Sequence, residues 1–127
     1  MSITLTNEFK ETSYTGFDVV YEADEMFVFV LSESFSLLPG SENYTLQEYA
    51  QLVIEANNLE NVEIKTEDGL VYFEYTSDKN SHLYHYTAYV YKSSDSFWLI
   101  QFATFSSEAN EYRNDIKDWA KSVEFAK

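Results

Sequence analysis

The chain has 127 residues, of which 45% are hydrophobic and 18% aromatic, with three glycines, one proline and no cysteine. This is the size of one domain with a single core, and the composition excludes disulfides, thiol catalysis and thiolate metal ligation. The net charge of −14 is uneven, because residues 1–64 carry twelve acids and one base, whereas residues 65–127 carry ten acids and seven bases. Such a field repels phosphate backbones and anionic membranes and attracts basic partners, so we expect neither nucleic acid nor membrane as a ligand.

Three strands are predicted in the first third of the chain. The stretches ITLTNEF (residues 3–9) and TGFDVVYE (residues 15–22) alternate apolar with polar positions, which is typical of half-buried strands. The next stretch, MFVFVLSESF (residues 26–35), begins with an uninterrupted apolar run, which predicts a strand buried on both faces. We therefore expect cover on both sides of the sheet.

A first helix is predicted over residues 45–57. Thr45 stands three residues before Glu48, which is the spacing of a capping box at a helix N-terminus. Its apolar residues recur at helical intervals and share one face: Leu46, Tyr49, Ala50, Val53 and Ile54.

Four further strands are predicted to form a meander. The stretch VEIKTEDGLVYFEYTS (residues 62–77) indicates a hairpin, because Asp68-Gly69 tolerates the positive φ angles of a type I′ turn. The stretches HLYHYTAYVYK (residues 82–92) and FWLIQFATF (residues 97–105) follow as strands, the second apolar on both faces.

The clearest helix of the chain is predicted over residues 107–122, with Ser106 or Ser107 as its N-cap. Acids come early in this helix and lysines late, which complements the helix dipole. We expect Trp119 to be buried against the sheet, as part of one apolar stripe: Ala109, Tyr112, Ile116, Trp119, Ala120 and Val123.

The predicted order of elements is therefore βββαββββα, with no internal boundary. We expect one α+β domain over residues 1–127, an antiparallel sheet of about six to seven strands with helices packed on it as an α/β/α sandwich.

Both histidines of the chain, His82 and His85, fall in the tyrosine-rich strand at residues 82–92. Residues an odd number apart in a strand point to opposite faces, so these two side chains cannot bind one metal ion together. One face is predicted to carry His82, Tyr84 and Tyr86, and the other to carry His85. The stretch is interpreted as a sheet strand rather than a metal or catalytic cluster.

Motifs for the common chemistries are missing from the sequence. It contains no Gly-x-Ser-x-Gly elbow, no phosphate-binding loop and no Gly-x-Gly-x-x-Gly turn. The acidic stretch EADE (residues 22–25) lacks the spacing and the glycine of a calcium loop. We therefore predict no catalytic residue, no metal site and no cofactor.

The acidity of the N-terminal half suggests one candidate recognition surface. Glu22, Asp24, Glu25 and Glu33 lie at or near the turn between the second and third predicted strands, so we expect them to cluster. Such a cluster would steer a basic partner protein toward the molecule. The alternative is a dispersed acidic surface that serves only solubility.

The tyrosine-rich strand suggests a second candidate surface. Tyr84 and Tyr86 are predicted on the same face, and tyrosine offers a large, rigid contact area at a low entropic cost. An apolar groove near these two residues would favour a chaperone-like function, whereas a convex acidic patch would favour an inhibitor.

The pattern resembles the PsbP-like superfamily, an α/β sandwich shared by the photosystem subunit PsbP, the Ran-binding Mog protein and small bacterial relatives. The resemblance rests on the order of elements, on NYTLQEYAQLVIEANNL (residues 43–59), and on SFWLIQFAT (residues 96–104) running into YRNDIKDWAKSVEF (residues 112–125). The last helix leads into an aliphatic-x-Phe segment, here Val123 and Phe125. These are packing patterns, and no functional residue is carried over by them.

The resemblance implies a non-catalytic module, since relatives act as accessory subunits, as regulators that bind another protein, or as chaperones for secreted effectors. We therefore expect an adaptor or chaperone-like protein-binding module. The alternatives are an acidic inhibitor or immunity protein that binds a basic partner, and, third, a small enzyme using tyrosine or carboxylate chemistry. The start MSITLTNEFK has no export-signal pattern and no stretch is apolar enough to span a bilayer, so we expect a cytoplasmic protein.

Overall fold

The computed structural model describes residues 1–6, 8–23, 26–37, 39–79 and 81–125. Its helices and strands follow the predicted order, βββαββββα. The strands are β1 Lys10–Thr12, β2 Val19–Ala23, β3 Met26–Ser34, β4 Lys65–Glu67, β5 Leu70–Lys79, β6 His82–Lys92 and β7 Ser96–Phe105. The helices are α1 Leu46–Ala56 and α2 Ala109–Lys121, and three short 3-10 turns are η1 Phe35–Leu37, η2 Ser41–Asn43 and η3 Ser106–Glu108.

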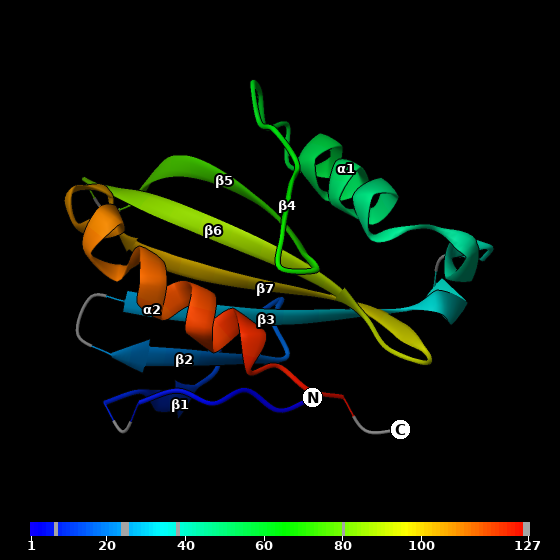
Figure 1. The fold of residues 1–127 in the computed structure, drawn as a ribbon, viewed down its shortest axis with the longest axis horizontal. Coiled ribbons are helices and arrows are strands. Elements are labelled where there is room, and N and C mark those ends of the chain that lie inside the picture. Colours follow the sequence, from blue (N-terminus) through cyan, green and yellow to red (C-terminus); the bar gives the residue numbers. More distant parts are fainter. Residues whose placement is uncertain (7, 24–25, 38, 80, 126–127) are drawn as a thin grey trace.

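The strands form one antiparallel seven-stranded sheet in the order β1-β2-β3-β7-β6-β5-β4 (Figure 1). The predicted meander from β4 to β7 is confirmed, and its tight turn has positive φ at both Asp68 (53°) and Gly69 (79°). β7 then pairs with β3, with Val30 opposite Ile100. The two predicted doubly apolar strands are thus neighbours in the middle of the sheet, where both of their faces can be covered.

One face of the sheet packs against α1. The capping box is present, because Thr45 Oγ1 accepts a hydrogen bond from the backbone N–H of Glu48 (3.1 Å) and Glu48 Oε1 accepts one from the backbone N–H of Thr45 (2.9 Å). Tyr49 is buried, and its ring stacks on that of Phe97 with centroids 4.4 Å apart. The predicted apolar face of this helix therefore forms the core on this side, together with Phe73, Ala88, Val90 and Leu99.

The other face of the sheet packs against α2, so the molecule is the predicted α/β/α sandwich. Ile116 and Ala120 are the buried residues of this helix, and they join the core formed by Ile100 and Phe102. The hydroxyl of Tyr91 donates a hydrogen bond to the backbone carbonyl of Ala120 at 2.7 Å, which ties the end of α2 to β6. The helix thus lies across the sheet, and its line of apolar residues faces the sheet.

A third apolar cluster lies on the same face as α1 but contains no helix residue. Val20, Phe29, Tyr84 and Ala103 are buried in it, and partly buried aromatic side chains surround them: Phe17, Phe27, Tyr86 and Phe105. This half of the face is therefore covered by side chains of the sheet and of the segment before β2, among the described residues, and not by a helix.

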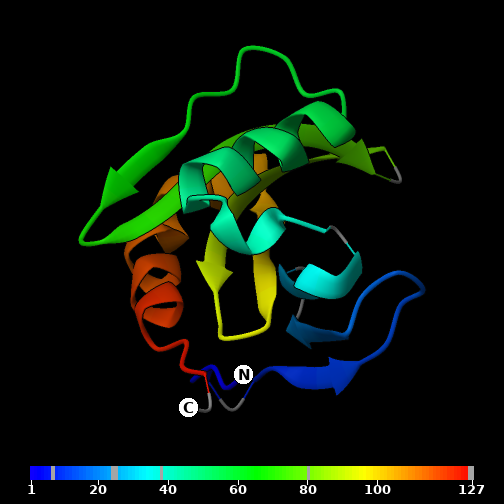
Figure 2. The ribbon, with the colours of Figure 1, turned by 90° about the vertical axis from the view of Figure 1, so that its right-hand side faces the viewer.

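The first predicted strand is wrong in its position. Paired backbone begins only at Lys10, and the segment before it makes one isolated bridge, between Ser2 and Glu124. Ile3 and Leu5 still alternate with more exposed neighbours, because they pack against the α2 core. The alternation thus reflects burial against a helix and not a place in the sheet. The bridge between Ser2 and Glu124 brings the start of the chain close to the segment that follows α2 (Figure 2).

The predicted cap of the last helix also needs correction. Ser106 and Ser107 form the 3-10 turn η3, and α2 begins after it with Glu108 as N-cap and no side-chain cap bond. The chain leaves β7 through this short 3-10 turn, so both serines lie within the turn and not at the start of the α-helix.

Candidate functional site

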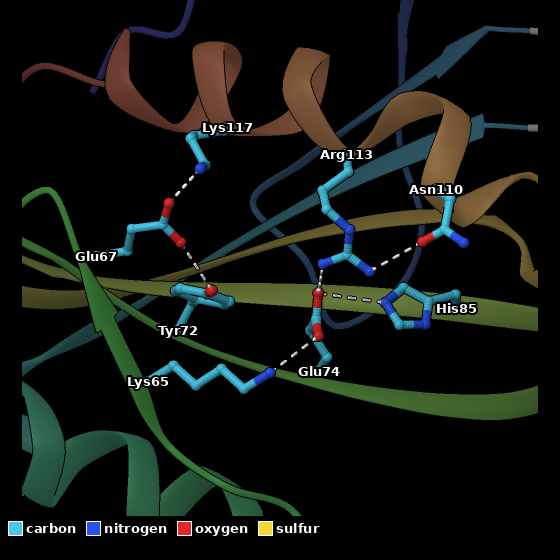
Figure 3. A network of polar contacts seen from close by, with 8 residues as sticks. All are labelled: Lys65, Glu67, Tyr72, Glu74, His85, Asn110, Arg113 and Lys117. Carbon is cyan, nitrogen blue, oxygen red and sulfur yellow. Dashed lines mark hydrogen bonds and ion pairs between the residues drawn. The ribbon is translucent and has the colours of Figure 1, made fainter.

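A network of charged side chains joins α2 to the outer strands of the sheet (Figure 3). At its centre is Glu74 on β5, whose carboxylate accepts a hydrogen bond from the guanidinium of Arg113 on α2 at 2.9 Å. The same carboxylate lies 3.5 Å from Lys65 Nζ and 3.6 Å from His85 Nε2. One carboxylate is thus surrounded by basic groups from β4, β6 and α2.

The basic groups determine the charge state of Glu74. Burial by itself would raise the pKa of its carboxyl, but Arg113, His85 and Lys65 outweigh burial and hold the pKa below its ordinary value. The side chain of Glu74 is only 17% exposed, so an ionised carboxylate here needs these partners.

Two more ion pairs continue the network along α2, and Figure 3 shows the first of them, between Lys117 and Glu67. Lys117 donates a hydrogen bond to Glu67, which also accepts one from the hydroxyl of Tyr72 at 3.2 Å, and Lys121 Nζ lies 3.1 Å from a carboxylate oxygen of Asp68. The bond from Lys117 is the main cause that lowers the pKa of Glu67. This side of α2, called here the basic flank, is defined by Arg113, Lys117 and Lys121.

The space inside this network is too small for a substrate. The cavity beside Glu74 and His85 has a volume of about 40 Å³, enough for a few water molecules. His85 Nε2 is buried and has no hydrogen-bond partner among the described residues, so its contact with Glu74 is electrostatic. Glu74 and His85 also line an open surface hollow of about 540 Å³ beside residues 58–62. The ion pairs of the network join α2 to the sheet.

The helix-free half of the α1 face contains an aromatic groove of about 360 Å³. Its floor crosses the sheet through Phe29 on β3, Gln101 on β7, Tyr86 on β6 and Tyr75 on β5. Its walls are Phe17 from the segment before β2 and, from the end of α1, Asn57 and Leu59. We call this space the aromatic groove.

The rings of the groove are held in place by one another. Tyr75 and Tyr86 stack with centroids 4.9 Å apart and planes within 5° of parallel, and the Tyr75 hydroxyl donates a hydrogen bond to Gln101. Phe17 and Phe29 lie 5.0 Å apart. Burial raises the pKa of Tyr75 and of Tyr86, so both remain neutral phenols that offer aromatic surface and hydrogen-bonding hydroxyls.

The two tyrosines predicted from the sequence, Tyr84 and Tyr86, differ in their exposure. Both lie on the α1 face of β6, as expected, but Tyr84 is buried between Phe27 and Phe105, with ring centroids at 6.2 and 5.1 Å. Tyr86 is partly exposed and lines the groove. Only Tyr86 is therefore placed to touch a ligand in the groove, with Tyr84 supporting the surface beside it.

Glu33 does not lie beside Glu22, as the predicted acidic cluster required. Glu22 lies at the end of β2 between Lys10 and Phe27, whereas Glu33 lies opposite Phe97 near the far end of β3. Glu22 is paired with Phe27 on β3, and Phe27 lies six residues before Glu33 along this extended strand, a distance of about 20 Å. The long strand β3 carries the chain away from the turn before Glu33 is reached. Asp24 and Glu25 lie outside the described residues.

Glu33 has a structural partner instead. Its carboxylate accepts a hydrogen bond from the hydroxyl of Tyr49 at 2.7 Å, which links β3 to α1. Burial, together with this bond to Glu33, raises the pKa of Tyr49. This acid therefore helps to hold α1 against the sheet.

The two histidines lie on opposite faces of β6, as predicted. His85 is beside Glu74 under α2, and the ring of His82 lies 5.2 Å from that of Phe105 on the other side. Among the described residues, no group of three acidic or histidine side chains is arranged to hold a metal ion.

Sequence reasoning missed a cavity of about 310 Å³ that lies on the other side of α2 from the basic flank. Trp119 lines it and is only partly buried, which corrects the expectation that this side chain lies in the core. The spacing of Glu108, Tyr112, Asp115 and Trp119 places them along one line of the helix and was visible in the sequence. What could not be seen was the N-terminal segment that forms the opposite wall.

The fold resembles that of three solved structures. Cyanobacterial PsbP (CyanoP) from Synechocystis sp. PCC 6803 is 18% identical with a TM-score of 0.64, covering 96% of this chain and 84% of that one. A Bacteroides thetaiotaomicron VPI-5482 protein is 8% identical with a TM-score of 0.63, covering 98% of this chain and 44% of that one. The Pseudomonas aeruginosa protein PA94, of unknown function, is 7% identical with a TM-score of 0.56, covering 95% and 99%.

These likenesses establish that the chain has a PsbP-like fold, as its sequence pattern predicted. No protein-family model and no curated protein matches the sequence. None of the helices in the described parts of the chain has the length and apolar character needed to cross a bilayer.

Proposed function

We propose that this protein is a non-catalytic accessory module that binds another protein, as an adaptor or a chaperone-like factor. The observation that carries the proposal is the aromatic groove, a concave surface on the half of the sheet that no helix of the described residues covers. Concave surfaces rich in tyrosine and phenylalanine favour protein and peptide ligands. The PsbP-like fold supports the same role, and PA94, one of the similar structures, is described as a candidate regulator.

The occupant that fits the groove best is an extended segment of a partner with an aromatic or large aliphatic side chain. Phe29, Tyr75 and Tyr86 offer ring faces, while Ser77 and Gln101 supply polar groups at the same surface. An apolar side chain would remove ring surface from water, and the polar groups would hydrogen-bond the backbone of the segment.

The two other functions find less support. An inhibitor that steers a basic toxin was expected to use four clustered acids, and Glu33 lies far from Glu22 and is bonded to Tyr49. An enzyme would need an acid or base that is available for proton transfer, and in the closest candidate, His85 with Glu74, the carboxylate is already paired with Arg113 and Lys65.

The test compares two neighbouring positions on β5 that point to opposite faces. Ser77 lines the groove, whereas Thr76 is on the α2 face, and both are exposed. Each is replaced in turn by the photo-cross-linking residue p-benzoylphenylalanine, and cells of the source organism are irradiated. We expect one or a few proteins to be cross-linked from position 77 and not from position 76.

Blocking variants complete the test. Ser77→Arg would fill the groove, and Thr76→Arg adds the same charge on the other face. A partner captured by the wild type and by Thr76→Arg, but lost by Ser77→Arg, supports the proposal. If the captured proteins are the same for all three, the groove is not the binding site.

A further inference from the structure

The cavity on the second side of α2 has features that no part of the proposed function uses. Its volume is about 310 Å³, which is at the lower end of the range for ligand sites. It lies between α2, the N-terminal segment around Phe9, the facing ends of β2 and β3 at Ala23 and Met26, and Thr104 on β7. The side of α2 that faces it, with Glu108, Tyr112, Asp115 and Trp119, is called here the acidic flank.

Three aromatic rings line the cavity. Phe9 and Trp119 meet edge to face with centroids 5.3 Å apart, and Tyr112 lies one helical turn before Asp115 on the same line of α2. Trp119 also lies against Phe102, with centroids 6.3 Å apart and planes 26° from parallel, so its position is fixed by the core beneath. The aromatic wall is thus rigid and partly open to the cavity.

Three carboxylates share this cavity with the rings: those of Glu8, Glu108 and Asp115. None of them has an ion-pair partner within the parts of the chain that the structure describes, and none of the described lining residues is basic. Three like charges around one space repel each other and attract a cation from outside.

Five of the eight basic side chains of the protein have partners outside this cavity. Lys65, Arg113, Lys117 and Lys121, four of the eight basic residues, pair with acids on the other side of α2. Lys92 donates hydrogen bonds to the backbone carbonyls of residues 42 and 44. The carboxylates of the acidic flank are thus available to a group from outside.

We propose that this cavity binds the basic side chain, arginine or lysine, of a partner protein. An aliphatic stem would pack on Phe9, Tyr112 and Trp119, and the cationic head would lie over their ring faces and next to the carboxylates of Glu108 and Asp115. Ring faces attract cations and carboxylates attract them more strongly, so both parts of the wall select the same ligand. This site lies on the face of the sheet opposite the aromatic groove and is independent of it.

The experiment follows the two tryptophan indole N–H signals by NMR on ¹⁵N-labelled protein. Trp119 lines the cavity, whereas Trp98 donates its indole N–H to Ser93 Oγ at 3.0 Å and serves as the internal reference. The probe is Nα-acetyl-arginine methylamide, and its control is Nα-acetyl-citrulline methylamide, which has the same shape without the charge. We expect the arginine probe to shift the Trp119 signal with a Kd of about 1 to 10 mM, because a single side chain provides few contacts.

Charge-neutral variants test which carboxylates act. The triple variant Glu8→Gln/Glu108→Gln/Asp115→Asn is expected to weaken binding of the arginine probe about tenfold or more. The matched control Glu60→Gln/Glu111→Gln/Asp118→Asn changes the net charge equally at exposed positions outside the cavity and is expected to change the Kd less than about twofold. An unchanged Trp98 signal verifies that each variant is folded. Should the triple variant fail to fold, Asp115→Asn alone is expected to weaken binding about twofold to threefold.

The inference is wrong if the Trp119 signal does not move with the arginine probe, if citrulline moves it equally, or if both triple variants lose binding to the same extent. The groove variant Ser77→Arg is expected to bind the probe as the wild type does. A failure of the groove proposal and a failure of this one can therefore be told apart.

Discussion

The two flanks of α2 differ in how their charges are paired. On the basic flank, Arg113 and Lys117 reach Glu74 and Glu67 across a space of about 40 Å³. On the acidic flank, Glu108 and Asp115 face a cavity of about 310 Å³ with no base in its described lining. One helix thus carries one side whose charges are paired and another side whose carboxylates have no ion-pair partner among the described residues.

The difference distinguishes charged side chains that stabilise the fold from charged side chains that can bind a ligand. Paired charges with little space between them stabilise the helix on the sheet, and they leave no surface for a ligand. Like charges without an ion-pair partner around a cavity repel each other and lower the stability slightly, so their presence fits a role in recognition. The comparison predicts that substitutions on the two flanks will have effects of opposite kind.

The largest effect is expected between the two flanks, at the buried line of α2. Ile116 is 3% exposed and packs in the core with Phe102. Ile116→Ala removes buried methyl and methylene groups and leaves a cavity, so it should lower the free energy of unfolding by about 2 to 4 kcal/mol. Urea denaturation measures this change. A loss below that of the flank variants would show that the charge pairs, rather than the apolar line, hold the helix.

A smaller loss is expected on the basic flank. Glu74→Gln removes the shared partner of Arg113, His85 and Lys65 and leaves these groups close together. Arg113 and Lys65 are about half exposed and are screened by solvent, so the loss should be about 1 to 2 kcal/mol in the same assay. An unchanged stability would mean that this network does not anchor α2.

The sequence was most informative where one local pattern decides the structure. The Thr45 capping box and the Asp68-Gly69 turn are local, and both formed as predicted. The apolar strands at residues 26–35 and 97–105 could be placed in the middle of the sheet because burial on both faces requires it.

The sequence was least informative where distant segments meet. The alternation of Ile3 and Leu5 is produced by packing against α2, which no local pattern distinguishes from a strand. The cavity beside Trp119 needs the N-terminal segment as its second wall, and the separation of Glu33 from Glu22 depends on the length of β3. The aromatic groove likewise combines four strands with the end of α1, so only Tyr86 could be suggested in advance.

The paired flank should also give the protein an acid-sensitive component of stability. The pKa of Glu74 and that of Glu67 are lower in the folded protein than the ordinary value, which is about 4.3 in an unfolded chain. Above that value both states are ionised and the stabilisation is complete. As the pH falls below it, the unfolded chain takes up protons first, and stability is lost until the folded carboxylates are protonated as well.

The measurement is the urea midpoint from about pH 7 down to about pH 3, a range that spans the ordinary carboxyl pKa. The variant Glu67→Gln/Glu74→Gln should have a lower midpoint at neutral pH and a shallower fall below about pH 5 than the wild type. Parallel curves for the two proteins would contradict the lowered pKa values and, with them, the role of this flank.

The smallest effect is expected on the acidic flank, and its sign is the opposite one. Asp115 lies in the middle of α2, away from the helix ends, and shares its cavity with the carboxylates of Glu8 and Glu108. Asp115→Asn keeps the size of the side chain and removes one of three like charges, so it should raise the free energy of unfolding by no more than about 0.5 kcal/mol at low salt. The gain should disappear as salt screens the remaining charges. A destabilisation comparable to that of Glu74→Gln would mean that Asp115 has a partner within the protein, and the acidic flank would then be as structural as the basic one.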